Sequence, residues 1–148
     1  MRIALASDHG GFELKGMMID WLKSRGIETE DLGTYDEESV DYPEYGWRCA
    51  EAVVRNEADK GLVFCGTGIG ISMAANKVKG ARCAVVTSDF TAEMAKAHNG
   101  ANLLAFGGRT TTIDDAVRWT SIWLDTEVDE SERHARRRRQ LDEMPHTT

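Results

Sequence analysis

Residues 63–77 read VFCGTGIGISMAANK, and this stretch decides the fold. Apolar residues lead into Cys65, glycines stand at positions 66, 68 and 70, and helix-forming sequence then resumes. A short apolar run, a glycine-rich turn and a helix are typical of a strand-to-helix unit in an α/β protein. The stretch leaves two readings open: a loop that binds a nucleotide, or a loop whose functional residue is the cysteine.

The same alternation extends along the chain and predicts a mainly parallel sheet with helices on both faces. Strands are expected at 2–7, 27–33, 61–65, 81–86 and 102–106. Helices are expected at 11–26, 43–56, after the glycines, at 89–98, after the capping pair Thr112 and Asp115, and at 129–142. Two prolines and no low-complexity linker give no domain boundary, so residues 1–148 are predicted to form one domain.

Composition excludes several classes of protein. Hydrophobic residues make up 41% and charged residues 29%, which is typical of a globular domain, and the net charge of −7 argues against a nucleic-acid partner. The first residues do not resemble a signal peptide, and no stretch approaches the roughly 20 apolar residues of a membrane span. Cys49, Cys65 and Cys83 show no CxxC spacing, so neither a disulfide framework nor a zinc site is predicted. We expect a cytoplasmic protein with reduced thiols and no membrane partner.

Polar and reactive residues are concentrated where the predicted strands end. The ends are followed by Ser7–Gly11, Cys65–Gly68, Thr87–Asp89 and Gly107–Arg109. Ligands of parallel α/β sheets bind beyond the carboxyl ends of the strands, so these segments predict a site. His98 and Asn99 instead precede a strand, and they reach the same edge only if their loop or helix folds back.

The glycine loop matches neither common nucleotide motif. Its spacing is GxGxG, whereas the dinucleotide fingerprint is GxGxxG and the P-loop is GxxxxGK[ST]. Its backbone N–H groups could still receive another anion, or the glycines could form only a tight turn. Cys65 stands at a strand end just before a helix, a setting that favours an accessible thiolate. The alternative is that Cys65 is a small buried hydrophobe, as we expect for Cys49 and Cys83.

The histidines and arginines allow structural and functional interpretations. Asp8 and His9 could cap the next helix or bind substrate, and His98 with Asn99 could end a helix or supply an acid–base group. Arg133 and Arg137 share one helix face and could clamp a phosphate with Arg109. Their helix has little apolar face, so it could pack on a neighbouring subunit. The remaining arginines of that run are expected on a solvated face balanced by acidic residues: Arg136, Arg138 and Arg139.

Five motifs together resemble the ribose-5-phosphate isomerase B family and its sugar-phosphate isomerase relatives. They are SDHGGFELK (7–15), DYPEY (41–45), CGTGIGISMAANK (65–77), AHNGANLLAFGGR (97–109) and ERHARRR (132–138). The resemblance spans residues 2 to about 140 in the right order. It implies an aldose–ketose isomerase without metal or cofactor and a Rossmann-like three-layer α/β/α sandwich with a five-stranded sheet. It also implies a homodimer or homotetramer with shared active sites, in which the C-terminal helical extension, about 127–148, is exchanged across a dimer.

The resemblance further implies a reaction and its residues. Ribose 5-phosphate and ribulose 5-phosphate would interconvert by ring opening and by C2/C1 proton transfer through a cis-enediolate. Cys65 matches the base, and His98 matches the ring-opening group, with Thr67 and Asp8 as helpers. Sugar hydroxyls would contact Asp8, Tyr42 and Asn99; the phosphate would contact His9, Arg109, Arg133 and Arg137, with His134 a weaker candidate. The enediolate would meet backbone N–H groups of Gly66, Gly68, Ile69, Gly70 and Ile71.

Other functions remain open from the sequence. Some relatives lack this cysteine and place a glutamate elsewhere in the chain; Ser72 stands at about the position of that glutamate here, so the resemblance implies an isomerase of the cysteine type. The substrate could be another phosphorylated sugar: allose 6-phosphate, galactose 6-phosphate or a tetrose phosphate. A non-catalytic sugar-phosphate-binding module is a second class. A redox thiol protein is a third, although the chain lacks a resolving cysteine at CxxC spacing.

Overall fold

Strands and helices alternate in residues 1–145, the part of the chain that the computed structural model describes. The strands are β1 (Arg2–Ser7), β2 (Glu28–Asp31), β3 (Lys60–Cys65), β4 (Cys83–Val85) and β5 (Leu103–Gly107). The helices are α1 (Phe12–Ser24), α2 (Tyr42–Val54), α3 (Ile69–Ala75), α4 (Asp89–Ala97), α5 (Ile113–Asp125) and α6 (Glu132–Glu143). None of the described helices is long and apolar enough to cross a membrane.

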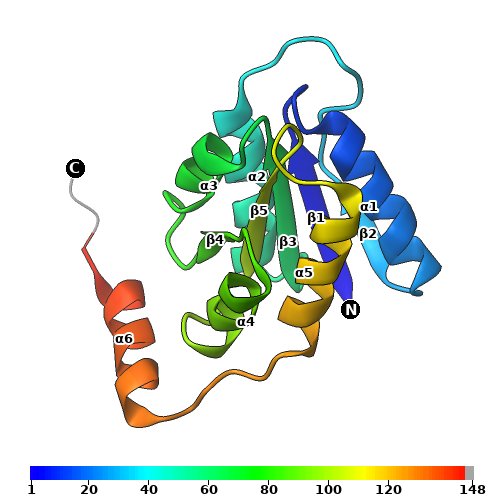
Figure 1. Ribbon diagram of the computed structural model, residues 1–148. Helices are drawn as coiled ribbons and strands as arrows, with labels where there is room; N and C mark the ends of the chain where they lie inside the picture. Colours follow the sequence, from blue (N-terminus) through cyan, green and yellow to red (C-terminus); the bar gives the residue numbers. More distant parts are fainter. Residues whose placement is uncertain (146–148) are drawn as a thin grey trace.

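The five strands form one parallel sheet in the order β2-β1-β3-β5-β4. Ser7 of β1 pairs with Phe64 of β3, and Cys65 of β3 pairs with Gly107 of β5. The carboxyl ends of the three central strands therefore meet at one edge of the sheet (Figure 1). This confirms the predicted parallel α/β sandwich.

The two faces of the sheet carry side chains of different size. Helices α1, α4 and α5 cover the face with the larger side chains, and α2 and α3 cover the face with the smaller ones (Figure 1). The first face includes Ile3, Leu5, Leu62, Phe64, Leu104 and Phe106; the second includes Ala4, Ala6, Val63, Cys65 and Ala105. Alternation along each strand produces this division, and the small residues let α2 and α3 approach the sheet closely.

Most predicted element ends are confirmed. Thr112 Oγ1 accepts a hydrogen bond from Asp115 N at 3.2 Å and caps α5. Gly26 follows α1 with a left-handed φ of +73°. The apolar residues of α1 at helical spacing, which predict its buried face, are Leu14, Met17, Met18, Trp21 and Leu22. Met17 departs from this pattern because it is exposed, whereas the side chain of Lys15 is buried.

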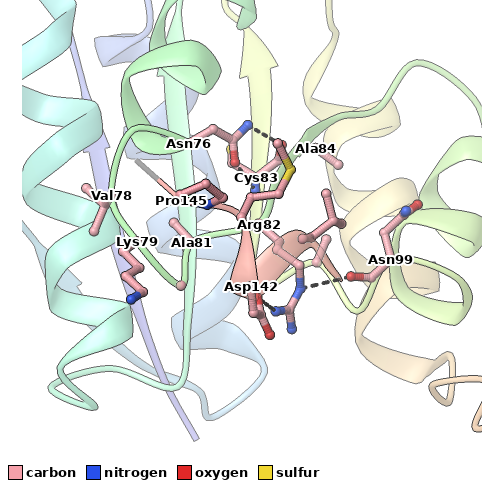
Figure 2. Close-up of a pocket in the computed structure, with 14 residues that line it drawn as sticks. Asn76, Val78, Lys79, Ala81, Arg82, Cys83, Ala84, Asn99, Asp142 and Pro145 are labelled. Atoms are coloured by element: carbon pink, nitrogen blue, oxygen red, sulfur yellow. Dashed lines mark hydrogen bonds and ion pairs between the residues drawn. The ribbon is translucent and has the colours of Figure 1, made fainter. Parts of the chain in front are cut away.

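The two outer strands are shorter than predicted, and each edge of the sheet is protected differently. At the β4 edge, Asn76 Nδ2 donates to Cys83 O at 2.9 Å, and Cys83 N donates to Asn76 Oδ1 at 2.8 Å (Figure 2). The side-chain amide thus takes the place of a further strand. At the other edge, β2 has the acidic sequence Glu-Thr-Glu-Asp at 28–31, and such charge disfavours strand addition.

Helix α6 stands apart from both helical layers (Figure 1). Arg138 Nη1 donates to His98 O at 3.0 Å, and Arg82 Nη1 pairs with Asp142 Oδ1 at 2.7 Å. A helix held mainly by polar contacts has little core of its own, as the sequence predicted. The last residues of the predicted 127–148 extension, 146–148, lie outside the described residues.

Candidate active site

Cys65 lies at the carboxyl end of β3, and its side chain is 5% exposed. Gly68 N donates to Cys65 Sγ at 3.1 Å, which stabilises negative charge on the sulfur. Gly68 has a left-handed φ of +80°, and a Cβ atom there would lie 2.9 Å from the carbonyl carbon of Phe106. Glycine is therefore required at 68 both for the turn and for the close approach of β5.

Three loops converge around this thiol. Gly108 N donates to Cys65 O at 2.8 Å, and Arg109 N donates to Gly66 O at 3.0 Å, which join the β5–α5 loop to the β3–α3 loop. A Cβ atom on Gly10 would lie 3.2 Å from Gly66 N, so the β1–α1 loop is equally close. The predicted meeting of strand ends is confirmed for the loops after β1, β3 and β5, whereas Ser88 and Asp89 after β4 cap α4 and pair with Arg118, respectively.

Polar side chains from these loops and from the first residue of α2 surround the glycine turn. Asp8 is buried, and its Oδ1 accepts from Gly11 N at 3.1 Å, so it also stabilises the start of α1. The Arg109 guanidinium reaches Gly66, where an added Cβ atom would lie 3.2 Å from its Nη1. The Tyr42 ring covers Gly70, where an added Cβ atom would lie 2.6 Å from the ring.

His9 is held in one orientation by the backbone. Val40 N donates to His9 Nδ1 at 3.2 Å, so the ring proton is on Nε2 and that nitrogen is the available donor. A neutral hydrogen-bond donor is therefore the role that this geometry favours for His9. Val40 was not identified from the sequence, and no signal could have identified it, because every residue except proline carries a backbone N–H.

The rest of the glycine loop can contribute backbone groups. Ile69 N donates to Thr67 Oγ1 at 3.3 Å, whereas Gly70 and Ile71 lie in the first turn of α3, where N–H groups lack a helical acceptor. The Ile71 side chain is buried in the core, so only its backbone can face a ligand. Ser72 Oγ donates to Ile69 O at 2.6 Å and is engaged within its own helix.

Of the other two cysteines, Cys49 is buried and Cys83 is half-buried. Burial raises the pKa of the Cys49 thiol to about 12, and burial also raises the pKa of Cys83. Both stay protonated near neutral pH, so neither is suited to act as a base. Cys65 is the cysteine that the fold places at the converging loops.

His98 and Asn99 lie at the amino ends of the strands, whereas Cys65 lies at their carboxyl ends. His98 ends α4, and the chain then enters β5 at Leu103, which pairs with Gly61 near the start of β3. Gly61 and Cys65 are separated by about 13 Å of strand, at about 3.3 Å per residue. The loop does not fold back, so His98 and Asn99 do not join Cys65 within one chain.

The arginines of α6 divide into two groups. Arg139 pairs with Glu132 on an exposed, charge-balanced face, as expected. Arg138 pairs with Glu130 but differs from the expectation, because its side chain is only 12% exposed and its Nη1 donates to His98 O. Arg133, Arg136 and Arg137 are exposed, and within residues 1–145 none of the three forms an ion pair. They lie on α6, which stands apart from the sheet and away from the loops around Cys65 (Figure 1).

The sequence predicted no metal site, but the fold brings three potential ligands together at α6. Donor atoms of His98, Asp129 and His134 all lie within 4.8 Å of one another. The two imidazole rings are stacked, with centroids 3.9 Å apart and planes at 12°. Lone pairs of stacked rings lie in nearly parallel planes and do not converge on one ion, so this arrangement suits ring stacking better than metal binding.

A cavity of about 450 Å³ lies between β4, the preceding loop and α6 (Figure 2). Arg82 crosses it, donating to Asn99 O at 3.0 Å and pairing with Asp142 at 2.7 Å. The cavity does not include Cys65 or its loops. It is therefore a feature of the α6 side of the molecule and not the space around the thiol.

Comparisons with known proteins agree with this architecture. The sequence profile of the ribose/galactose isomerase family matches residues 3–141. The chain is 41% identical over 136 residues to ribose-5-phosphate isomerase B of Escherichia coli (strain K12), covering 92% of this chain and 91% of the relative. It is similar to the structure of ribose-5-phosphate isomerase B from Clostridium thermocellum, with a TM-score of 0.94, 49% identity, and 97% and 96% of the chains covered. It is also similar to that of Mycoplasma genitalium with bound ribulose-5-phosphate, with a TM-score of 0.89, 36% identity, and 95% and 93% covered.

The family match and the similar proteins identify this parallel α/β sandwich as an aldose–ketose isomerase. The chain belongs to the ribose/galactose isomerase family. This confirms the resemblance carried by the five sequence motifs.

Proposed function

We propose that this isomerase interconverts ribose 5-phosphate and ribulose 5-phosphate, with Cys65 as the base. The hydrogen bond from Gly68 N to Cys65 Sγ, 3.1 Å long, carries the proposal. It places a backbone donor on the sulfur at the junction of three loops, where a sugar carbonyl would lie. The named activity of the similar proteins from E. coli and C. thermocellum supports the choice of ribose 5-phosphate.

In the proposed reaction Cys65 removes the proton from C2 of the open-chain aldose and returns it to C1. The intermediate is a cis-enediolate, whose oxygen carries the negative charge that develops in the transition state. Backbone N–H groups between Gly66 and Ile71 stabilise that charge, and losing one such donor typically costs about 10²–10³ in rate. His98 opens the sugar ring, with Asp8 and Thr67 assisting proton transfer.

Binding of the phosphate would position the carbonyl against Cys65. His9 Nε2–H and the Arg109 guanidinium are the donors on the Cys65 side, supported by the contacts of both residues with the loops. Tyr42 covers Gly70 and would contact a sugar hydroxyl, as would Asp8 and, from the other edge of the sheet, Asn99.

We further propose that a second copy of the chain completes the site. Cys65 and His98 lie at opposite ends of the strands, so a single chain cannot bring both to one substrate. A partner related by a twofold axis would bring its His98, Asn99, Arg133 and Arg137 to the Cys65 loops, and the arrangement would be reciprocal. The exposed arginines and the separated helix α6 support this arrangement.

The alternative substrates are other phosphorylated sugars, since the matching family includes galactose as well as ribose isomerases. Initial rates with ribose 5-phosphate, allose 6-phosphate, galactose 6-phosphate and a tetrose phosphate distinguish them. We expect the highest kcat/KM with ribose 5-phosphate. A much higher value with another sugar would overturn the proposed substrate.

The base is tested by Cys65→Ala, with Cys83→Ala as the matched control. We expect Cys65→Ala to lower kcat by about 10²-fold or more while the affinity for the sugar phosphate stays within a few fold, because general acid–base groups contribute about 10²–10⁴. Cys83→Ala should retain the wild-type kcat, since Cys83 lies in the edge strand away from the loops. Near-normal turnover by Cys65→Ala would remove the thiol from the mechanism. Binding without turnover by the wild type would instead favour the non-catalytic module.

A further inference from the structure

Lys15 of α1 is a buried cation that the proposed reaction does not use. Its side chain is 1% exposed, and its Nζ donates to Asp31 Oδ1 and to Thr34 O, both at 2.6 Å. The ammonium also lies 5.6 Å from the ring centroids of Phe12 and Tyr35. Burying a charge is costly unless it is fully paired, so these partners must be held in place for the lysine to be tolerated.

The partners of Lys15 belong to the segment that joins β2 to α2. Asp31 ends β2, and its Oδ1 also accepts from Gly33 N at 3.0 Å. Ser7 N donates to Gly33 O at 2.7 Å, and Thr34 N donates to Ser7 O at 2.8 Å. Lys15 therefore holds this segment against Ser7, the residue that immediately precedes Asp8 and His9.

The same segment reaches the site at two further points. Val40 N donates to His9 Nδ1 at 3.2 Å, which fixes the imidazole and leaves Nε2–H as the donor. Two residues later the segment enters α2 at Tyr42, whose ring covers Gly70. Residues 32–41 thus orient side chains on the substrate-binding half of the site, whereas Cys65 is held independently by β3 and Gly68.

We propose that Lys15 is a positioning residue for the phosphate- and hydroxyl-binding side of the active site. It does not contact the substrate; it acts through Asp31 and Thr34, which fix the 32–41 segment and through it the orientation of His9. The inference rests on the proposed function for its substrate. The alternative is that Lys15 contributes only to the stability of the fold.

The two roles predict different kinetics for Lys15→Met, which removes the charge and keeps the apolar stem. For a positioning role we expect KM for ribose 5-phosphate and Ki for inorganic phosphate to rise by about tenfold, since loss of one hydrogen bond to a charged group weakens binding by about that factor. The kcat should fall by a smaller factor than KM rises, because the thiol and its N–H donor remain in place and only the positioning of the carbonyl by the bound phosphate is weakened. Lys23→Met on the exposed side of the same helix is the matched control and should leave all three constants unchanged.

A second variant keeps the inference testable if Lys15→Met is too unstable to assay. Asp31→Ala removes one acceptor at a position whose side chain is 37% exposed, and Lys15 keeps Thr34 O. We expect the same direction of change in KM and Ki. A folded Lys15→Met or Asp31→Ala enzyme with wild-type KM and Ki would overturn the positioning role and leave only a structural one.

A direct measurement separates this inference from the proposed function. The ¹⁵N chemical shifts of His9 report which ring nitrogen carries the proton. In the wild type and in Lys23→Met we expect the Nε2–H form, and titration with inorganic phosphate should perturb it. In Lys15→Met the tautomers should mix and the response to phosphate should weaken, even if ribose 5-phosphate is not the substrate. An unchanged His9 spectrum in Lys15→Met would contradict the inference.

Discussion

Substitution of Gly68 tests the geometry of the glycine turn most directly. Gly68→Ala has two separable costs, because the backbone has a φ of +80° and an added Cβ would lie 2.9 Å from the carbonyl carbon of Phe106. A side chain in the left-handed region costs about 1–2 kcal/mol. Forcing a methyl group against backbone typically costs about 1–3 kcal/mol more. We therefore expect Gly68→Ala to lower the free energy of unfolding by about 2–5 kcal/mol.

Two other glycines separate these costs. Gly26 has a φ of +73° but no atom within 4 Å of an added Cβ, so Gly26→Ala should lower the free energy of unfolding by only about 1–2 kcal/mol. Gly16 lies inside α1 with open space around it, so Gly16→Ala should raise it by about 0.5–1 kcal/mol. From the most to the least stable, the expected order is Gly16→Ala, wild type, Gly26→Ala and Gly68→Ala.

The assay is urea unfolding of all four proteins at one protein concentration, with thermal unfolding as a second measure. A change of 1 kcal/mol corresponds to about 2–4 °C in Tm for a chain of about this size. Gly68→Ala should also lower kcat, because it displaces the N–H that donates to Cys65 Sγ. Gly26→Ala should not. If Gly68→Ala is no less stable than Gly26→Ala, the reasoning from close approach to β5 is wrong.

Two further predictions concern the His98 side of the molecule. If the site is shared, a mixture of inactive Cys65→Ala and inactive His98→Ala chains should recover about one quarter of wild-type activity, because half of randomly paired dimers hold one intact site. A mixture of Cys65→Ala and Arg109→Ala chains should recover none. Equal failure of both mixtures would refute the shared site. Burial, with the nearby His98, lowers the pKa of His134, so below about pH 6.5 the folded chain binds fewer protons than the unfolded chain and loses stability as the pH falls. Amides of the helix that carries His134 should therefore lose hydrogen-exchange protection between pH 7 and pH 5, and His134→Phe, which keeps the stacked ring, should not show this loss. Unchanged hydrogen-exchange protection of the wild type at pH 5 would contradict the lowered pKa of His134.

The positions of the strands were predictable because apolar runs and their stop signals are local. The order of the strands was not, because it depends on pairing between distant segments. The outer strands were predicted too long: β4 pairs on one side only, and hydrophobicity alone does not show where such pairing ends. Burial of Lys15 was missed because lysine is rarely buried, and its partners at 31 and 34 are brought near only by the fold.

The candidate site was predictable on the Cys65 side for a physical reason. Residues that follow parallel strands must meet at one edge, and this rule gathered Asp8, His9, Cys65 and Arg109. The same rule excludes His98, since a residue between a helix and the next strand lies at the other edge. Whether a second chain supplies the missing residues depends on surface complementarity, which one sequence does not encode in a readable pattern.

The protection of the sheet edges has a consequence for how the protein can grow into larger assemblies. Charge on the β2 edge weakens with salt and is partly neutralised, because Glu28 pairs with Arg2 and Asp31 pairs with Lys15. The Asn76 amide instead occupies the backbone N–H and C=O of Cys83 on the β4 edge. The β2 edge is thus protected by charge and the β4 edge by side-chain hydrogen bonds. On the β4 side the sheet is therefore protected from fibre-like extension at high ionic strength as well, because the Asn76 side chain already binds the backbone groups of Cys83.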